Sequence, residues 1–154
     1  MTWFNGYGLL FMAIILLPNI VFAVKCKDGF VNAWQNKCVE VMEQVGRFSC
    51  FILMVVNIPG TWFGFWFRGA LVAYIVTYAV LLAAYCLIWI VCFRRNSIFR
   101  ALALSILPSV LFLFSGVMIR SVPLLAAAAL FAPCHILLSY KNAAATAKKS
   151  REPS

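Results

Sequence analysis

Two charged side chains four positions apart are the first candidates for chemistry in this sequence. Glu43 precedes Arg47 by four residues, and this spacing and order favour an ion pair on one face of an α-helix. A catalytic role would require a third polar group close by, and only Gln44 is evident in the adjoining sequence. The spacing therefore predicts a structural ion pair, with Glu43 and Arg47 as an anchor where a helix enters a membrane interface.

A second candidate is His135, the single imidazole of the chain. Histidine ordinarily changes charge near neutral pH, so His135 could relay protons or sense pH, or could simply be hydrogen-bonded within its helix. Its neighbour Cys134 is one of six cysteines, none of which forms a CxxC pair. Because no second pair of ligands lies nearby, the sequence predicts neither a metal site nor a cofactor.

Polar and helix-breaking residues inside apolar runs are the remaining candidates. Asn57, Pro59 and Thr61 lie near the middle of an apolar run. One interpretation is a discontinuous helix whose freed carbonyls and Asn57 side chain line a pathway for a small solute or ion. The alternative is a proline kink that neighbouring helices satisfy. Asn19, which follows Pro18 in the first apolar run, is a further binding candidate.

The composition indicates which elements carry these residues. Hydrophobic residues make up 65% of the chain and charged residues 11%, against about 45–50% and about 25% in soluble domains. The 154 residues leave room for one domain, since each membrane crossing needs about 20 apolar residues. The net charge of +9 comes from short groups of basic residues between apolar runs, a pattern that argues against nucleic-acid binding.

Five apolar runs are long enough to cross a bilayer. We therefore expect an all-α fold, a bundle of five transmembrane helices within a single domain, residues 1–141. The first run has its positive charge after it, which favours an uncleaved helix over a signal peptide. No carboxylate lies in the five runs, which argues against proton-coupled transport through an acidic relay. The expected helices cover residues 7–24, 48–67, 70–93, 98–119 and 122–140.

Two segments are expected outside the bilayer. Residues 25–46 form the longest connection, and their apolar positions recur at helical spacing from residue 34 onward. This pattern predicts an interfacial amphipathic helix over about 32–46, between the first and second transmembrane helices. Residues 142–154 are rich in Ala, Lys and Ser, and we expect a disordered basic cytoplasmic tail.

The basic residues also predict an orientation. With five crossings, eleven Lys and Arg residues fall on one side and only Arg68 and Arg120 on the other. Because cytoplasmic loops carry the excess of positive charge, the N-terminus is expected outside and the C-terminus in the cytoplasm. Aromatic residues cluster at 3–7 and 62–67, both on the expected outer side, which agrees with interfacial aromatic belts.

One resemblance accompanies this pattern. The sequences Pro-Asn-Ile at 18–20, Lys-Asp-Gly-Phe at 27–30 and Glu-Gln-Val-Gly-Arg at 43–47 resemble small multi-pass membrane proteins of Gram-positive bacteria that have no known activity. The resemblance covers mainly residues 1–60. It implies a bacterial plasma membrane and transfers no activity.

The sequence leaves three functional hypotheses. The first is a non-enzymatic accessory or interaction protein. Its expected partners are the lipid bilayer, anionic lipid headgroups on its cytoplasmic face, and either a second copy of the chain or another membrane protein. The second is a small transporter or channel with its pathway at residues 57–61. The third is a membrane enzyme acting on lipid, for which Glu43, Arg47 and His135 are the polar candidates, although no arrangement of residues specifies a reaction.

Overall fold

The chain folds into five helices. The computed structural model describes residues 3–26, 33–93 and 97–149, and within these ranges the fold is all-α. Three helices begin at polar caps, where the side chains of Asn5, Asn36 and Ser97 accept hydrogen bonds from backbone N–H groups of the first turn. The helices are α1 (Gly6–Lys25), α2 (Lys37–Val55), α3 (Ala70–Cys92), α4 (Ile98–Met118) and α5 (Val122–Lys149).

At one end of the bundle, hydrogen bonds join the start of α1 to the end of α2. The N–H of Asn5 donates to the carbonyl of Val55 at 2.7 Å, and the N–H of Asn57 donates to the carbonyl of Trp3 at 2.8 Å. The start of α5 lies at the same end, where the N–H of Val122 donates to a carbonyl of the α2–α3 connection. We call this the aromatic end, after its rings at Trp3, Phe4, Tyr7, Trp62, Phe63, Phe65, Trp66 and Phe67.

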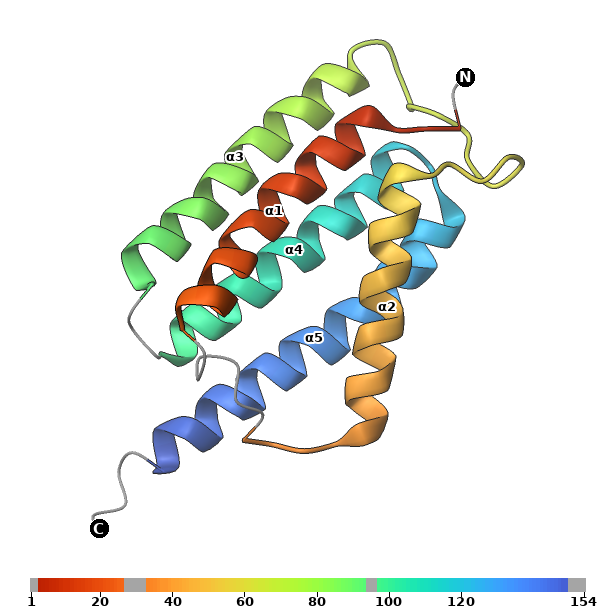
Figure 1. Ribbon diagram of the computed structural model, residues 1–154. Helices are drawn as coiled ribbons and strands as arrows, with labels where there is room; N and C mark the ends of the chain where they lie inside the picture. The colour runs from red at the N-terminus through yellow and green to blue at the C-terminus, as the bar shows by residue number, and fades with distance from the viewer. Residues whose placement is uncertain (1–2, 27–32, 94–96, 150–154) are drawn as a thin grey trace.

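The opposite end joins the other helix termini. The N–H of Trp34, just before α2, donates to Oδ1 of Asn142 in the last part of α5 at 2.8 Å. Nη1 of Arg100, in the first turn of α4, donates to the carbonyl of Phe93 after α3 at 3.1 Å. Successive helices thus run in alternate directions between two ends (Figure 1). We call this the basic end, after Lys25, Lys37, Arg100, Lys141, Lys148 and Lys149.

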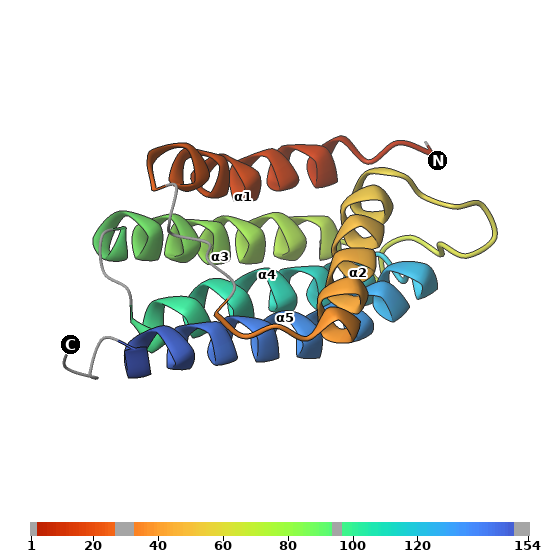
Figure 2. The ribbon, with the colours of Figure 1, turned by 60° about the horizontal axis from the view of Figure 1, so that its bottom comes forward.

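The helices pack in two orientations. In Figures 1 and 2, the axes of α1, α3, α4 and α5 are roughly parallel or antiparallel, whereas α2 crosses them obliquely. Helix α5 packs against both α4 and α2, and α3 packs against α4 and α1. Four large aromatic side chains of α3 are buried in this interior, at Tyr74, Tyr78, Tyr85 and Trp89.

The outward faces of the bundle are apolar. On α3, for example, Val72, Val76 and Val80 are all exposed at helical spacing. Among the residues that the structure describes, four helices, α1, α3, α4 and α5, are long and apolar enough to cross a membrane. Apolar side chains on the outside of long helices are typical of helices surrounded by hydrocarbon. The four helices therefore indicate a membrane protein and are compatible with a multi-pass one.

The predicted transmembrane helix over residues 48–67 is wrong. Helix α2 begins eleven residues earlier and ends at Val55, and residues 56–69 form a non-helical connection. Pro59 disfavours the helical conformation at the residue before it. Gly60 and Gly64 follow with φ of 82° and 76°, a left-handed backbone that glycine adopts readily. These residues end the helix that the apolar composition alone would extend.

Two further expectations differ from the structure. Of the stretch expected as a separate interfacial helix, residues 37–46 form the first half of α2, which continues to Val55 without a break. Residues 33–36 are not helical, and residue 32 lies outside the described ranges. Helix α5 continues to Lys149, where a disordered tail was expected. Alanines at 143–145 and 147 have the highest helix propensity and explain this extension. Helices α1, α3 and α4 lie within one residue of the expected ranges.

Candidate functional site

The centre of the candidate site is a buried carboxylate on α2. Glu43 has no exposed surface, and its Oε1 accepts hydrogen bonds from Nε of Arg47, at 3.0 Å, and from Nη2 of the same side chain. The two residues therefore form the ion pair that their spacing predicts. The Glu43 side chain is fully buried, whereas the Arg47 side chain is 33% exposed. The expected position of the pair at a membrane interface stays a prediction.

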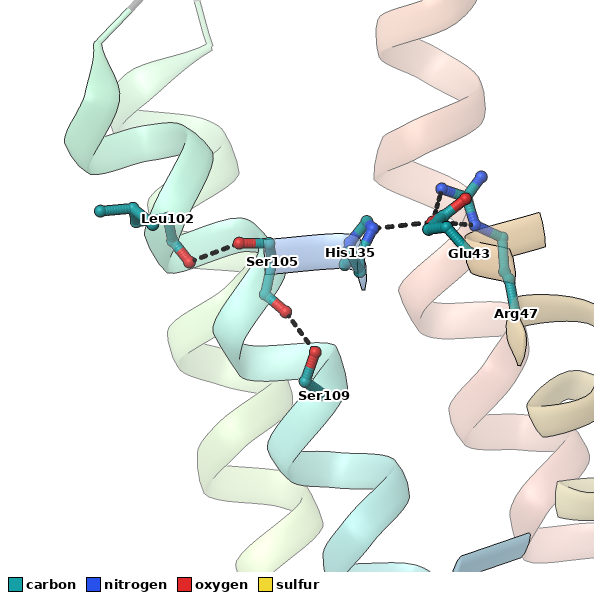
Figure 3. Close-up of polar contacts among 6 residues, drawn as sticks. All are labelled: Glu43, Arg47, Leu102, Ser105, Ser109 and His135. Atoms are coloured by element: carbon teal, nitrogen blue, oxygen red, sulfur yellow. Dashed lines mark hydrogen bonds and ion pairs between the residues drawn. The ribbon is translucent and has the colours of Figure 1, made fainter. Parts of the chain in front are cut away.

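A third polar partner comes from α5. Nδ1 of His135 lies 2.8 Å from Oε1 of Glu43, in a hydrogen bond that the carboxylate accepts (Figure 3). The imidazole also stacks on Phe131, with ring centroids 4.6 Å apart. The sequence pointed to all three residues, Glu43, Arg47 and His135, but did not predict contact between Glu43 and His135, because 92 residues separate them.

A glycine allows α2 and α5 to approach closely enough for these contacts. A Cβ atom built on Gly46 would lie 2.9 Å from both Cα and Cβ of Phe131. Gly46 is three residues from Glu43, on the same buried face of α2, and Phe131 is one turn from His135 on α5. The small residue thus positions the Glu43 carboxylate opposite the imidazole, the close-packing role that small residues have in membrane helices.

The other carboxylate oxygen of Glu43 has unused acceptor capacity. Oε2 is buried and has no hydrogen-bond partner among the described residues, because both Arg47 and His135 bind Oε1. A buried carboxylate oxygen without a donor is costly. Glu43 is therefore the group at this site best able to accept a further hydrogen-bond donor.

A second polar pair joins α1 to α3. Nδ2 of Asn19 donates to the hydroxyl oxygen of Tyr85 at 2.7 Å and to the carbonyl of Ile15 at 2.8 Å. Asn19 was a candidate from the sequence, whereas Tyr85 was not, because an isolated tyrosine in an apolar run has no distinguishing spacing. The pair stabilises the packing of the two helices through an interhelical hydrogen bond.

The polar residues of the different helices lie at a similar depth. Asn19, Tyr85 and His135 follow the first residues of α1, α3 and α5 by 13, 15 and 13 positions, or about 20 Å at ~1.5 Å per residue. Ser105 precedes the last residue of α4 by 13 positions and is buried. Together with Glu43 these residues form what we call the polar layer, defined as Asn19, Glu43, Tyr85, Ser105 and His135.

Two serines of α4, Ser105 and Ser109, are satisfied within their own helix. Oγ of Ser105 donates to the carbonyl of Leu102 at 3.0 Å, and Oγ of Ser109 donates to the carbonyl of Ser105 at 2.7 Å (Figure 3). Hydroxyls bonded in this way add no free donor to the bundle interior. The interhelical bonds of the polar layer therefore come from its two side-chain pairs.

The candidates at residues 57–61 lie elsewhere. Asn57 is buried at the aromatic end, where its backbone bonds to Trp3, while Pro59 is exposed. Oγ1 of Thr61 donates to the carbonyl of Ile58 within the connection. The proposed pathway required these residues to interrupt a membrane-spanning helix near its middle. That premise is wrong, because α2 has already ended at Val55.

The sequence predicted no carboxylate in the five crossings, and the four helices long and apolar enough to cross a membrane contain none. Hydropathy began the second crossing at residue 48, after Glu43, but α2 begins at Lys37 and carries Glu43 into the interior. The described part of the chain contains no group of three or more His, Cys, Asp or Glu side chains placed to hold a metal ion. Fold and site together give an all-α bundle with four candidate membrane spans and an ionisable cluster around a buried carboxylate. No protein-family model, curated protein or solved structure matches the chain.

Proposed function

We propose that the chain crosses the bacterial plasma membrane five times, with the aromatic end outside and the basic end in the cytoplasm. Two observations support this topology: four helices are long and apolar enough to cross a membrane, and successive helices run in alternate directions between the two ends of the bundle. The described basic end carries six Lys or Arg residues, whereas the aromatic end carries Arg68 and Arg120. An excess of positive charge on one side is typical of the cytoplasmic face. Lys27, Arg94, Arg95 and Arg151 lie outside the described residues.

The surface of α2 supports its inclusion among the membrane-crossing helices. Val41, Val45, Phe48 and Ile52 are exposed on one face, while Glu43 is buried on the other. A helix in water would have the opposite arrangement. Ionisable side chains of membrane helices face the bundle interior and pair there, as Glu43 does.

Within this topology, the chain acts as a non-enzymatic accessory or interaction protein. The observation that carries this conclusion is that the polar layer joins helices to one another, α2 to α5 and α1 to α3. Such bonds hold a bundle together. The apolar outer faces remain available to lipid and to a partner, either a second copy or another membrane protein. The basic end suits anionic lipid headgroups, at about 1 kcal/mol per cation near the surface.

Co-purification in a mild detergent tests the accessory role. The full chain is expressed with an affinity tag in its native membrane, cross-linked before solubilisation, and purified beside a tagged, unrelated multi-pass protein. We expect one membrane protein, or a second copy of this chain, to be recovered in stoichiometric amount only with this bait. Recovery of the chain alone, together with turnover of a substrate by the purified protein, would show that it is an enzyme.

A second function, transport of a small solute or ion, is favoured by one observation. The unpartnered Oε2 of Glu43 lies inside the bundle, and an ionisable residue at membrane depth commonly marks a transport pathway. The polar layer thus replaces residues 57–61 as the candidate pathway. Arg47 and His135, which flank Glu43, are each partly exposed.

Flux into proteoliposomes distinguishes the two functions. If the chain is a transporter, Glu43→Gln is expected to abolish uptake of its solute, while Glu40→Gln, one turn earlier on α2, leaves uptake unchanged. Asn57→Ala also leaves uptake unchanged, because Asn57 lies at the aromatic end. Equal flux through the wild type and Glu43→Gln would exclude the polar layer as a pathway.

A further inference from the structure

Exposed aromatic rings gather on the connection between α2 and α3. Phe63, Trp66 and Phe67 are 56%, 61% and 61% exposed, although each carries a large apolar ring. They lie on a non-helical segment, so their exposure does not follow from the packing of a membrane helix. Their location at one end of the bundle indicates a surface that contacts something other than bulk water.

This connection is fixed to the ends of α4 and α5. The carbonyl of Thr61 accepts a hydrogen bond from the N–H of Val122 at 3.2 Å. The indole Nε1 of Trp66 donates to the carbonyl of Val117 at 2.7 Å. The rings are therefore held in a defined array at the aromatic end, and the indole N–H of Trp66 is already bonded although Trp66 remains 61% exposed.

One cation, Arg120, stacks on the rings, and a second, Arg68, follows Phe67 in the same segment. The guanidinium carbon of Arg120 is 4.9 Å from the ring centroid of Trp66 and 5.4 Å from that of Phe63. Both Arg120 and Arg68 are exposed. The sequence has no Asp or Glu between Glu43 and Glu152. The surface thus combines apolar rings with cations that have no acidic neighbour in their own segment, and its partner should offer both hydrocarbon and anionic groups.

A phospholipid interface has this chemistry. Its phosphates suit the two guanidinium groups, and the layer beneath them suits aromatic rings, which concentrate at that level in membrane proteins. We propose that residues 58–69, with Arg120, form an aromatic anchor that binds the headgroup layer of the bilayer, with both arginines at phosphate and the three exposed rings just below. This inference rests on the proposed membrane topology and adds a lipid-binding surface on the outer side.

Fluorine NMR of the full chain in phosphatidylcholine nanodiscs tests the aromatic anchor. The five tryptophans are labelled with fluorotryptophan, and the resonances of Trp66 and Trp89 are assigned by their loss in Trp66→Phe and Trp89→Phe. We expect a lipid spin-labelled just below the headgroup to broaden the Trp66 resonance until it is lost. A water-soluble paramagnetic chelate should leave it intact. Trp89 is buried and should resist the chelate in every case.

Each other result would overturn the anchor. Broadening of Trp66 by the chelate alone would place the ring in water. Broadening by neither agent would mean that protein, such as a second copy, covers the ring. Resistance of the chain to alkaline extraction from membranes tests the topology separately. A chain that stays in the membrane while Trp66 contacts water would thus refute the anchor alone.

Discussion

Replacing Glu43 with alanine is expected to lower the free energy of unfolding by about 3 kcal/mol. Removing one partner of a buried ion pair costs about 3–5 kcal/mol, and the lower value applies because the Arg47 side chain is 33% exposed. The variant leaves Arg47 and His135 without the oxygen that both bind. Thermal unfolding in lipid nanodiscs should show a melting temperature about 6–12 °C lower, at ~2–4 °C per kcal/mol.

Two controls make this expectation specific. Glu40→Ala removes a carboxylate from the first turn of the same helix and should lower stability by no more than about 1 kcal/mol, the contribution of an acidic residue at a helix N-terminus. A double-mutant cycle between Glu43→Ala and His135→Ala should give a coupling energy of about 0.6–1.7 kcal/mol, the range of interhelical hydrogen bonds in membranes. Additive effects of the two substitutions would mean that the imidazole and the carboxylate do not interact.

Gly8→Ala is expected to destabilise the contact between α1 and α2 by about 3 kcal/mol, the upper part of the range for overpacking. A Cβ atom at Gly8 would lie 1.9 Å from the carbonyl oxygen of Met54 and 2.8 Å from its carbon. Because these are backbone atoms near the end of α2, no change of rotamer relieves the clash. The helices must separate, which weakens the hydrogen bond between Asn5 and Val55.

Alanine substitutions at two other glycines serve as controls for the loss of stability expected from Gly8→Ala. At Gly6, on the same helix, the nearest atom to a new Cβ is 3.7 Å away in the ring of Phe4, an ordinary contact, so Gly6→Ala should be nearly neutral. Gly46→Ala should be intermediate, with its closest contacts near 2.9 Å. Chemical denaturation in mixed micelles measures the free energies of unfolding of the three variants and so their order of stability. A Gly8→Ala variant as stable as Gly6→Ala would contradict the close approach of α1 and α2.

Apolar runs predicted α1, α3 and α4 well because those helices have apolar residues throughout and end where the runs end. Helix α2 was misplaced because hydropathy does not detect where a helix begins. Asn36 caps α2, whereas Lys37, Glu40, Glu43 and Arg47 made its first half look like a surface helix. The breaker at Pro59 was recognised, but both interpretations, a discontinuous helix at a pathway and a proline kink, placed it within a helix and not in the connection after it.

In the polar layer too, the contact within one helix could be predicted from the sequence, whereas the contacts between helices could not. The Glu43–Arg47 pair follows from a spacing of four residues on one helix. The contacts of Glu43 with His135 and of Asn19 with Tyr85 span 92 and 66 positions. They depend on how α2 meets α5 and how α1 meets α3. Gly46, which permits one of these approaches, has no distinguishing pattern in the sequence.

The central claim is that α2 crosses the bilayer with the four apolar helices, and the number of crossings decides it. Four crossings would leave both ends of this chain in one compartment, whereas five separate them. Reporters fused to each end, one active only outside the cytoplasm and one fluorescent only within it, measure this directly in intact cells. We predict an N-terminus outside and a C-terminus in the cytoplasm. Both ends in the same compartment would contradict the passage of α2 through the membrane.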